Sequence, residues 1–356
     1  MRSKKNLLVT LSDNNYINQA KQLFSSVYWN AGWDGDYMLL AHEVPDEELK
    51  WFRDKGILVR KCNPLYHGPM GDGNYSISVV DKFYLFTEEF KKWGHVVFLD
   101  SDIIVRSAID KLAETKTFSS PQIYKRNFKA HFFKIDCEER DLVEKEYNLK
   151  RSAFNSGVFS FNTDIIKEDT FTKIMNVFNK YANISNGDDS ILNLFFYDQW
   201  SKSPLVYNVQ VNYIGLKKYK GIILHFQRHS HYAPLWEPQN FYYPEWKTNL
   251  EKAEFIDLSK VQLVRAWSIF KIKWYSLFLK GCLGINRMFD RLIHSSLGYK
   301  LRSVFHDKLR FFFKYRLWHF VIYILRTPDR LLGRLGQFIK KYNPDLYNKL
   351  RKVKGG

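Results

Sequence analysis

The strongest constraint on the fold is the stretch 96–105, in which an apolar and largely β-branched run is broken by two carboxylates, Asp100 and Asp102. An apolar run of this kind predicts a buried strand of a parallel sheet, because such strands are covered on both faces. The carboxylates therefore mark the carboxyl end of that strand, the edge where open α/β sheets bind ligands. Residues two apart on a strand share a face, so the stretch predicts a divalent cation that holds a phosphorylated substrate.

A structural alternative stays open for the same two carboxylates. An Asp-x-Asp pair after a strand also serves as a turn former or a helix cap, in which the side chains accept hydrogen bonds from loop amides. The choice between a metal site and a cap depends on the rest of the chain.

Apolar strands and amphipathic helices alternate along the first hundred residues. This is the βαβ order of a doubly wound parallel sheet, and it predicts an α/β, Rossmann-like, mixed but mainly parallel sheet with helices on both faces. The expected strands lie at residues 7–11, 37–41, 57–59, 96–99, 103–105, 154–159, 205–207 and 222–225. The expected helices lie at residues 16–29, 46–55, 77–92, 169–182 and from 187 onward, and 107–150 are expected to form a partly helical insertion.

Charge divides the chain in two. Residues 258–356 contain 22 lysines and arginines against four aspartates and no glutamate, a net charge of +18. The whole chain also carries +18, so residues 1–257 are neutral overall. We therefore expect an α/β domain at 1–257 and a distinct basic region at 258–356 that seeks an anionic partner.

In this basic region, basic and aromatic residues alternate at helical spacing. Basic amphipathic helices with Trp and Phe on the other face lie in the bilayer interface, where anionic headgroups attract them. We expect residues 258–356 to form such helices and to bind an anionic membrane surface. The alternative is a helical subdomain packed on the first domain, and both can hold. Nucleic acid is not expected, because no recognition motif accompanies the charge.

The remaining bulk features concern the compartment. Three widely spaced cysteines, Cys62, Cys137 and Cys282, predict reduced thiols. The N-terminus leads directly into an apolar strand, and no apolar run in the basic region approaches the roughly 20 residues that span a bilayer. The expected location is cytoplasmic, peripheral to the inner face of the membrane.

Six short motifs follow one another within residues 6–240. They are Ser-Asp-Asn-Asn-Tyr at 12–16, Lys82, Asp-Ser-Asp at 100–102, Phe-Asn-Ser-Gly-Val-Phe at 154–159, Gly-Asp-Asp-Ser-Ile-Leu-Asn at 187–193 and Ile-Leu-His-Phe at 223–226. This ordered set resembles glycosyltransferase family 8, whose members include glycogenin and bacterial lipopolysaccharide glucosyl- and galactosyltransferases. The resemblance implies a retaining transferase of the GT-A fold that uses a UDP-sugar and Mn²⁺, or Mg²⁺ in its place.

The resemblance also implies the site residues. Asp100, Asp102 and His225 would be the metal ligands, a donor set that suits Mn²⁺ better than a zinc site, although a lone His225 after an apolar strand is more often a core histidine. The nucleotide-sugar-binding residues would be Asp13, Asn15, Tyr16, Lys82, Asp100, Ser101 and Asn155. The structural alternatives are a solvated Lys82 and a turn-forming Asn155.

Asp188 and Asp189 are the expected catalytic residues. The family usually has Asp-Gln here, so Asp189 stands in place of a glutamine. Glycosyl transfer passes through an oxocarbenium-like transition state, which a negative group opposite the leaving UDP stabilises. Asp189 would act electrostatically, which is our working hypothesis, or attack to form a glycosyl-enzyme. The structural alternative is that both aspartates only cap the following helix.

A second departure from the family follows His225. The family pattern places a lysine there to hold the diphosphate, and the chain lacks it. Arg228 or His231 would supply the missing charge, Arg228 as a permanent, bidentate cation. His231 is also a rival third metal ligand.

Together these features predict metal-dependent, retaining transfer of a hexose, glucose or galactose, from a UDP-sugar to a glycan or lipid-linked acceptor, as in lipopolysaccharide or polysaccharide synthesis. Two alternatives are a nucleotidyltransferase-like enzyme, which would lack the Asp188–Asp189 site, and a non-catalytic sugar- or lipid-binding module.

Overall fold

The computed structural model describes residues 4–68, 76–131, 138–185, 187–211, 220–226 and 243–293. Its contacts divide the chain into a compact unit at residues 1–284 and a second unit at 285–356, and the first is described below.

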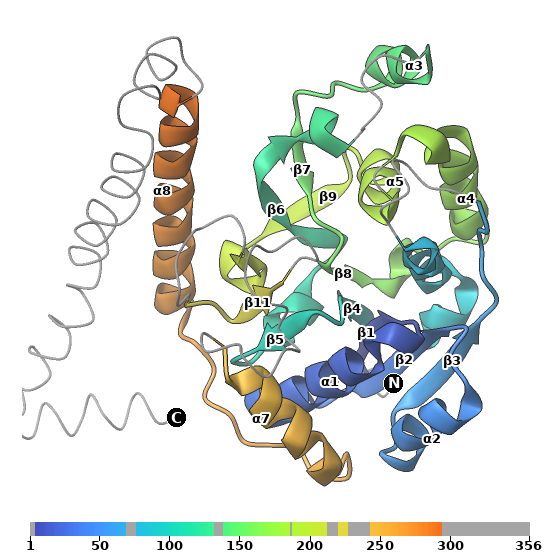
Figure 1. Cartoon of the computed structure of the whole chain (residues 1–356), viewed down its shortest axis with the longest axis vertical. Coiled ribbons are helices and arrows are strands. Elements are labelled where there is room, and N and C mark those ends of the chain that lie inside the picture. Colours follow the sequence, from blue (N-terminus) through green and yellow to red (C-terminus); the bar gives the residue numbers. More distant parts are fainter. Residues whose placement is uncertain are drawn as a thin grey trace, which may run out of the picture. The chain divides into compact units, whose positions relative to one another are not determined.

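A mixed sheet forms the centre of the first unit (Figure 1). Its parallel half contains, in spatial order, β3 (Leu58–Cys62), β2 (Asp36–His42), β1 (Leu7–Ser12) and β4 (His95–Leu99). Helix α1 (Ile17–Ala31) connects β1 to β2, and α2 (Asp46–Asp54) connects β2 to β3. The predicted βαβ order is confirmed, and the carboxyl ends of β1 and β4 lie side by side.

Antiparallel strands extend the sheet beyond β4. Strand β8 (Val158–Asn162) pairs with β4, β6 (Phe118–Asn127) with β8, and β7 (Ser152–Phe154) with β6, while β9 (Trp200–Ser203) pairs parallel to β6. The turn between β7 and β8 therefore lies beside the carboxyl end of β4.

A small second sheet continues the chain after Asp102. Strand β5 (Ile103–Val105) pairs antiparallel with β11 (Ile223–His225), which pairs parallel with β10 (Val209–Gln210). The register sets His225 opposite Ile103, and the amide of Phe226 donates to the carbonyl of Asp102 at 3.0 Å. This pairing brings the end of β11 to the end of β4.

Helices cover both faces of the parallel strands, as predicted. On one face, α1 and α2 pack together, and the ring of Phe24 lies 6.0 Å from those of Tyr37 and Phe52. The other face forms a core with the 3₁₀ helix η2 (Ile77–Phe86), α4 (Thr170–Tyr181) and α5 (Gly187–Phe195). Continuous burial on two faces explains why β1, β2 and β4 are largely apolar rather than alternating, whereas the edge strand β3 is only partly buried.

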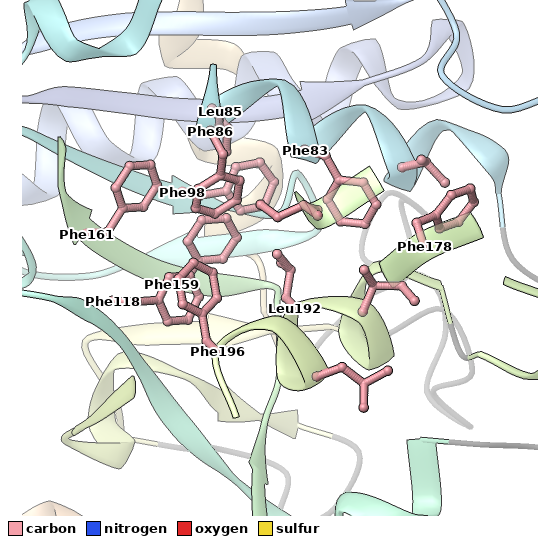
Figure 2. Close-up of a cluster of buried hydrophobic side chains, with 14 of the residues drawn as sticks. Phe83, Leu85, Phe86, Phe98, Phe118, Phe159, Phe161, Phe178, Leu192 and Phe196 are labelled. Carbon is pink, nitrogen blue, oxygen red and sulfur yellow. The ribbon is translucent and has the colours of Figure 1, made fainter. Parts of the chain in front are cut away.

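Phenylalanines dominate that second core (Figure 2). Phe118 stacks on Phe196 with ring centroids 4.0 Å apart, and Phe86 stacks on Phe161 at 4.9 Å. These contacts fix β6 and β8 against the segments that carry Lys82 and Asp188, so the core determines where those charged side chains are placed.

Two local predictions are wrong, and a third is right only in part. The helix expected at 77–92 is two 3₁₀ helices, η2 and η3 (Glu88–Lys92), because Thr87 between them is extended. Residues 205–207 form the 3₁₀ helix η8 (Leu205–Tyr207) rather than a strand, because the amide of Tyr207 turns back to the carbonyl of Pro204 at 3.1 Å. Residues 107–150 are partly helical as expected, in η4 (Asp110–Glu114), η5 (Phe128–His131) and α3 (Glu138–Glu146). They also contain the sheet strand β6, which was not expected because its Ser-Ser-Pro-Gln sequence lacks an apolar pattern.

Part of the basic region packs on the α/β domain. Gln262 donates to the hydroxyl of Tyr28 at 2.7 Å, and α8 (Ile269–Ile293) buries Ile272, Tyr275 and Leu279. The domain boundary expected at 257 stays a prediction. Within the described part of the chain, no helix combines the length and apolarity needed to cross a membrane.

Candidate active site

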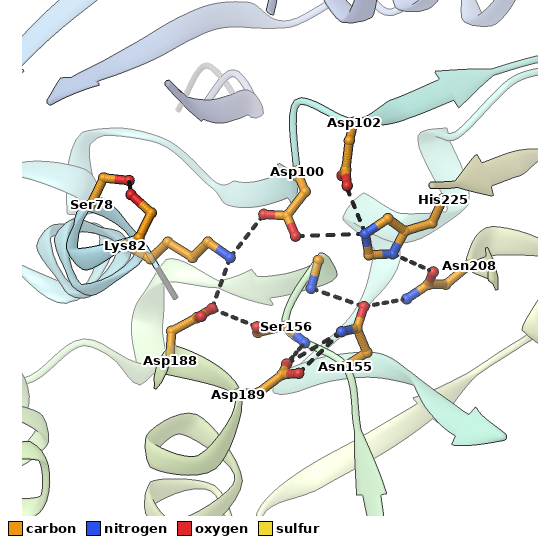
Figure 3. Close-up of polar contacts among 12 residues, drawn as sticks. Ser78, Lys82, Asp100, Asp102, Asn155, Ser156, Asp188, Asp189, Asn208 and His225 are labelled. Atoms are coloured by element: carbon orange, nitrogen blue, oxygen red, sulfur yellow. Dashed lines mark hydrogen bonds and ion pairs between the residues drawn. The ribbon is translucent and has the colours of Figure 1, made fainter. Parts of the chain in front are cut away.

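The carboxyl edge of the sheet gathers polar side chains from segments far apart in the sequence (Figure 3). They come from the end of β4, from η2, from the β7–β8 turn, from the start of α5, from the residue just before β10, and from the end of β11. The residues concerned are Lys82, Asp100, Asp102, Asn155, Ser156, Asp188, Asp189, Asn208 and His225.

Asp100, Asp102 and His225 form a triad with one ligand atom each inside a 4.8 Å span. Nε2 of His225 lies 3.3 Å from Oδ1 of Asp102 and 3.8 Å from Oδ2 of Asp100. Burial opposes a charge on the imidazole, but attraction by Asp102 and then Asp100 outweighs it and raises the pKa of His225. A field that favours a proton at this point also favours a divalent cation, and hard oxygens with one imidazole suit Mn²⁺ or Mg²⁺.

Gly157 allows the β7–β8 turn to approach this triad. Its carbonyl accepts from the amide of Asp100 at 2.8 Å. A Cβ atom on Gly157 would lie 2.3 Å from Cε1 of His225 and 2.6 Å from Oδ2 of Asp100. Any larger residue would displace a side chain of the triad.

Lys82 bridges the triad to the start of α5. Its ammonium lies 2.8 Å from Oδ1 of Asp100 and 2.8 Å from Oδ2 of Asp188, and only 3 % of the residue is exposed. Burial alone would lower the pKa of Lys82, but the two carboxylates raise it, so the lysine stays charged. The alternative of a solvated Lys82 is therefore excluded. Lys82 also occupies one oxygen of Asp100 and leaves the other facing His225.

Asp188 and Asp189 are both held by the β7–β8 turn. The hydroxyl of Ser156 donates to Asp188 at 2.5 Å, and the amide of Ser156 donates to Asp189. Nδ2 of Asn155 lies 3.2 Å from Oδ2 of Asp189. Burial, and then the charge of Asp188, raise the pKa of Asp189 to about 6.

The expected nucleotide-sugar-binding residues Asp13, Asn15 and Tyr16 follow β1, the neighbour of β4. Asp13 accepts from the amide of Asn15 at 2.9 Å and begins the short helix η1 (Asn14–Tyr16). Asn15 is exposed, whereas Asp13 and Tyr16 are partly buried. Ser101 is buried between the two aspartates of the triad. Arg228 and His231 lie outside the described residues.

Sequence reasoning missed Ser156, Gly157 and Asn208. The first two lie inside the motif at 154–159, so the sequence could have indicated them. Asn208 had no signal of its own, because it follows η8 and reaches His225 only through the pairing of β10 with β11.

A mixed α/β sheet with an Asp-x-Asp pair at the carboxyl end of β4 defines a protein of the GT-A glycosyltransferase fold. The sequence profile described as "Glycosyl transferase family 8" matches residues 8–233, and the chain belongs to this family.

Individual relatives agree with that assignment. Glycosyltransferase GlyB of Streptococcus pneumoniae serotype 4 is 24 % identical over 234 residues, which are 65 % of this chain and 50 % of GlyB. Galactinol synthase 1 of Ajuga reptans is 23 % identical over 184 residues, which are 47 % of this chain and 53 % of that enzyme. The chain thus spans about half the length of the curated relatives it matches.

Two solved structures show the shared fold. Galactosyltransferase LgtC, in complex with donor and acceptor sugar analogs, aligns with a TM-score of 0.51 at 14 % identity over 73 % of this chain and 97 % of its own. The bifunctional glycosyltransferase WbbM aligns with a TM-score of 0.53 at 16 % identity over 72 % and 52 %.

Proposed function

We propose that the protein transfers a hexosyl group, glucose or galactose, from a UDP-sugar to a glycan or lipid-linked acceptor with retention of configuration. The observation that carries this proposal is the convergence of the Asp100–Asp102–His225 triad with Lys82 and the Asp188–Asp189 pair at one sheet edge (Figure 3). Membership of glycosyl transferase family 8 supports it.

The triad would hold Mn²⁺ or Mg²⁺, and the bound cation would neutralise negative charge on the diphosphate of the departing UDP. Asp13, Asn15 and Tyr16, at the end of the adjacent strand β1, would bind the uridine. Ser101 lies between two ligands and would contact the diphosphate, and Arg228 would replace the lysine that the family has after the histidine. Lys82 would orient Asp100 and Asp188 without contacting solvent.

Asp189 would stabilise the positive charge that develops on the sugar. Both of its oxygens receive hydrogen bonds, from the Ser156 amide and from Asn155. Hydrogen bonding of both oxygens favours a fixed negative charge over a freely attacking nucleophile, so we assign Asp189 electrostatic stabilisation. Asp188, shared between Lys82 and Ser156, would orient the sugar hydroxyls, and Asn155 would contribute to the same sugar pocket.

Incubation with a panel of UDP-sugars tests this function. We expect metal-dependent release of UDP from UDP-glucose or UDP-galactose, with the anomeric configuration retained in the product. An Asp102→Asn variant should lose this activity. Release of pyrophosphate from UTP and a sugar phosphate would instead identify a nucleotidyltransferase, and UDP-sugar binding without release would identify a binding module.

The basic region supplies a second proposal, which concerns the acceptor. In the described part of α8, Phe270, Trp274 and Leu277 form a stripe beside Lys271 and Lys273, and Phe270 and Leu277 are 67 % and 64 % exposed. Such a stripe, on a chain whose excess charge lies entirely beyond residue 257, fits the interface of an anionic membrane. We propose that the enzyme works at the cytoplasmic face of a membrane on a lipid-linked acceptor.

A further inference from the structure

We propose that Asn208 is a positioning residue that fixes the ring of His225 and connects it, through Asn155, to Asp189. This inference rests on the proposed function, in which Nε2 of His225 is a metal ligand. Figure 3 shows the chain of contacts: Nδ1 of His225 to Oδ1 of Asn208 at 3.0 Å, Nδ2 of Asn208 to Oδ1 of Asn155 at 3.1 Å, and Nδ2 of Asn155 to Asp189 at 3.2 Å.

The direction of every hydrogen bond in this series follows from the groups at one end of it, whose roles as donor or acceptor are fixed. The amide N–H of Gly157 can only donate, and it donates to Oδ1 of Asn155 at 3.2 Å. The carboxylate of Asp189 accepts, so the atom of Asn155 facing it is the NH₂ group. Both ends of the Asn155 amide are thereby assigned. A flipped amide is excluded, because its NH₂ group would face the N–H donor of Gly157 and its oxygen would face the carboxylate oxygens of Asp189.

The same reasoning shows which nitrogen of the His225 imidazole carries the proton. Oδ1 of Asn155 accepts, so Asn208 must present its NH₂ group to it and its oxygen to His225. Nδ1 of His225 must therefore carry a proton and donate. In the neutral ring this leaves the lone pair on Nε2, the nitrogen that faces Asp100 and Asp102.

The three polar side chains of this network are buried. Asn208, Asn155 and His225 are 3 %, 6 % and 2 % exposed, so bulk water does not replace a missing partner. An unpaired polar group in such a place is unfavourable, and a fully paired network is rigid. The orientation of the triad and the position of Asp189 are consequently parts of one network, with Asn208 as the link that touches neither the cation nor the sugar.

The tautomer of His225 gives the first test, because it needs neither metal nor substrate. Long-range ¹H–¹⁵N spectra of the metal-free protein, recorded above the pH at which His225 titrates and assigned with the His225→Gln variant, should show the proton on Nδ1. A proton on Nε2 would overturn the proposal. Failure of the proposed function would appear separately, as absence of Mn²⁺ binding or UDP release in the unchanged protein.

Two variants of Asn208 then separate its contact with His225 from its contact with Asn155. Asn208→Asp keeps an acceptor for Nδ1 of His225 but cannot donate to Asn155, so Mn²⁺ affinity should be unchanged or tighter while kcat falls about tenfold or more. Asn208→Leu removes both contacts, and Mn²⁺ affinity should fall about 10- to 100-fold, as for other groups that orient metal ligands. Asn249, a buried amide on α7 (Glu245–Lys252) bonded to Gln22, provides the matched control.

In the control variant Asn249→Leu, Mn²⁺ affinity should equal that of the unchanged protein, which shows that loss of a buried amide alone is not the cause. Equal effects of the two Asn208 variants on Mn²⁺ affinity, or unchanged affinity in Asn208→Leu, would reduce Asn208 to packing and overturn the inference. Metal affinity is read by titration of free Mn²⁺, and turnover by UDP release.

Discussion

At the scale of single residues, the site depends on one position without a side chain. Replacing Gly157 by Ala would set a methyl group 2.3 Å from His225 and 2.6 Å from Asp100. We expect Mn²⁺ affinity to fall by about tenfold or more, with a stability loss of about 1–3 kcal/mol from overpacking. Gly94→Ala is the control, because its Cβ would meet no atom closer than 3.4 Å. Wild-type metal affinity in Gly157→Ala would show that the triad is free to move.

Asp189 leads to a prediction about pH. Burial and Asp188 raise the pKa of Asp189 from 3.8 to about 6, so folding favours its protonated form. The group therefore stabilises the metal-free protein most below pH 4, and this contribution is lost as pH rises to 6. Relative to Asp189→Ala, the unfolding free energy of the wild type should drop by about 2 kcal/mol between pH 4 and pH 7. Urea unfolding at both pH values measures it, and a pH-independent difference would refute the raised pKa.

At the scale of secondary-structure elements, burial decided what the sequence could predict. Strands β1, β2 and β4 are covered on both faces, so their apolar runs were sufficient to place them and the carboxylates at their edge. Strand β6 carries Ser119 and Ser120 and is held by its pairing with β8 and β9. The local sequence of β6 does not indicate this pairing. Asn208 was unpredictable for the same reason, since its role depends on the contact between β10 and β11.

The start of α8 provides a prediction about where the folded unit ends. Ile272, Tyr275 and Leu279 are buried, and Gln262 bonds Tyr28. Burying an apolar side chain of this size contributes about 1.5–3 kcal/mol, so a chain ending at 284 should be at least about 3 kcal/mol more stable than one ending at 257. Denaturant midpoints of the two chains compare them directly. Equal midpoints would instead support a domain boundary at 257.

At the scale of the whole molecule, the distribution of charge suggests how the enzyme meets its acceptor. Residues 285–356 carry 17 lysines and arginines against four aspartates, whereas residues 1–284 carry a net charge of only +5. Each basic residue near an anionic bilayer contributes about 1 kcal/mol at physiological ionic strength. Attachment by the basic region would hold the α/β domain beside the membrane that carries the proposed lipid-linked acceptor.

Flotation with phosphatidylglycerol vesicles tests this arrangement. The full chain should bind and be released by salt, whereas a chain ending at 284 should bind far more weakly, because it lacks most of the excess charge. Replacing Phe270 and Leu277 by Ser in the full chain should also weaken its binding, since insertion of apolar side chains adds to the attraction of charge. Phe255→Ser is the control, because Phe255 is 72 % exposed but lies outside α8. Equal flotation of the full and shortened chains would remove residues 285–356 from membrane binding, and equal flotation of the stripe variant and the Phe255 control would remove the α8 stripe.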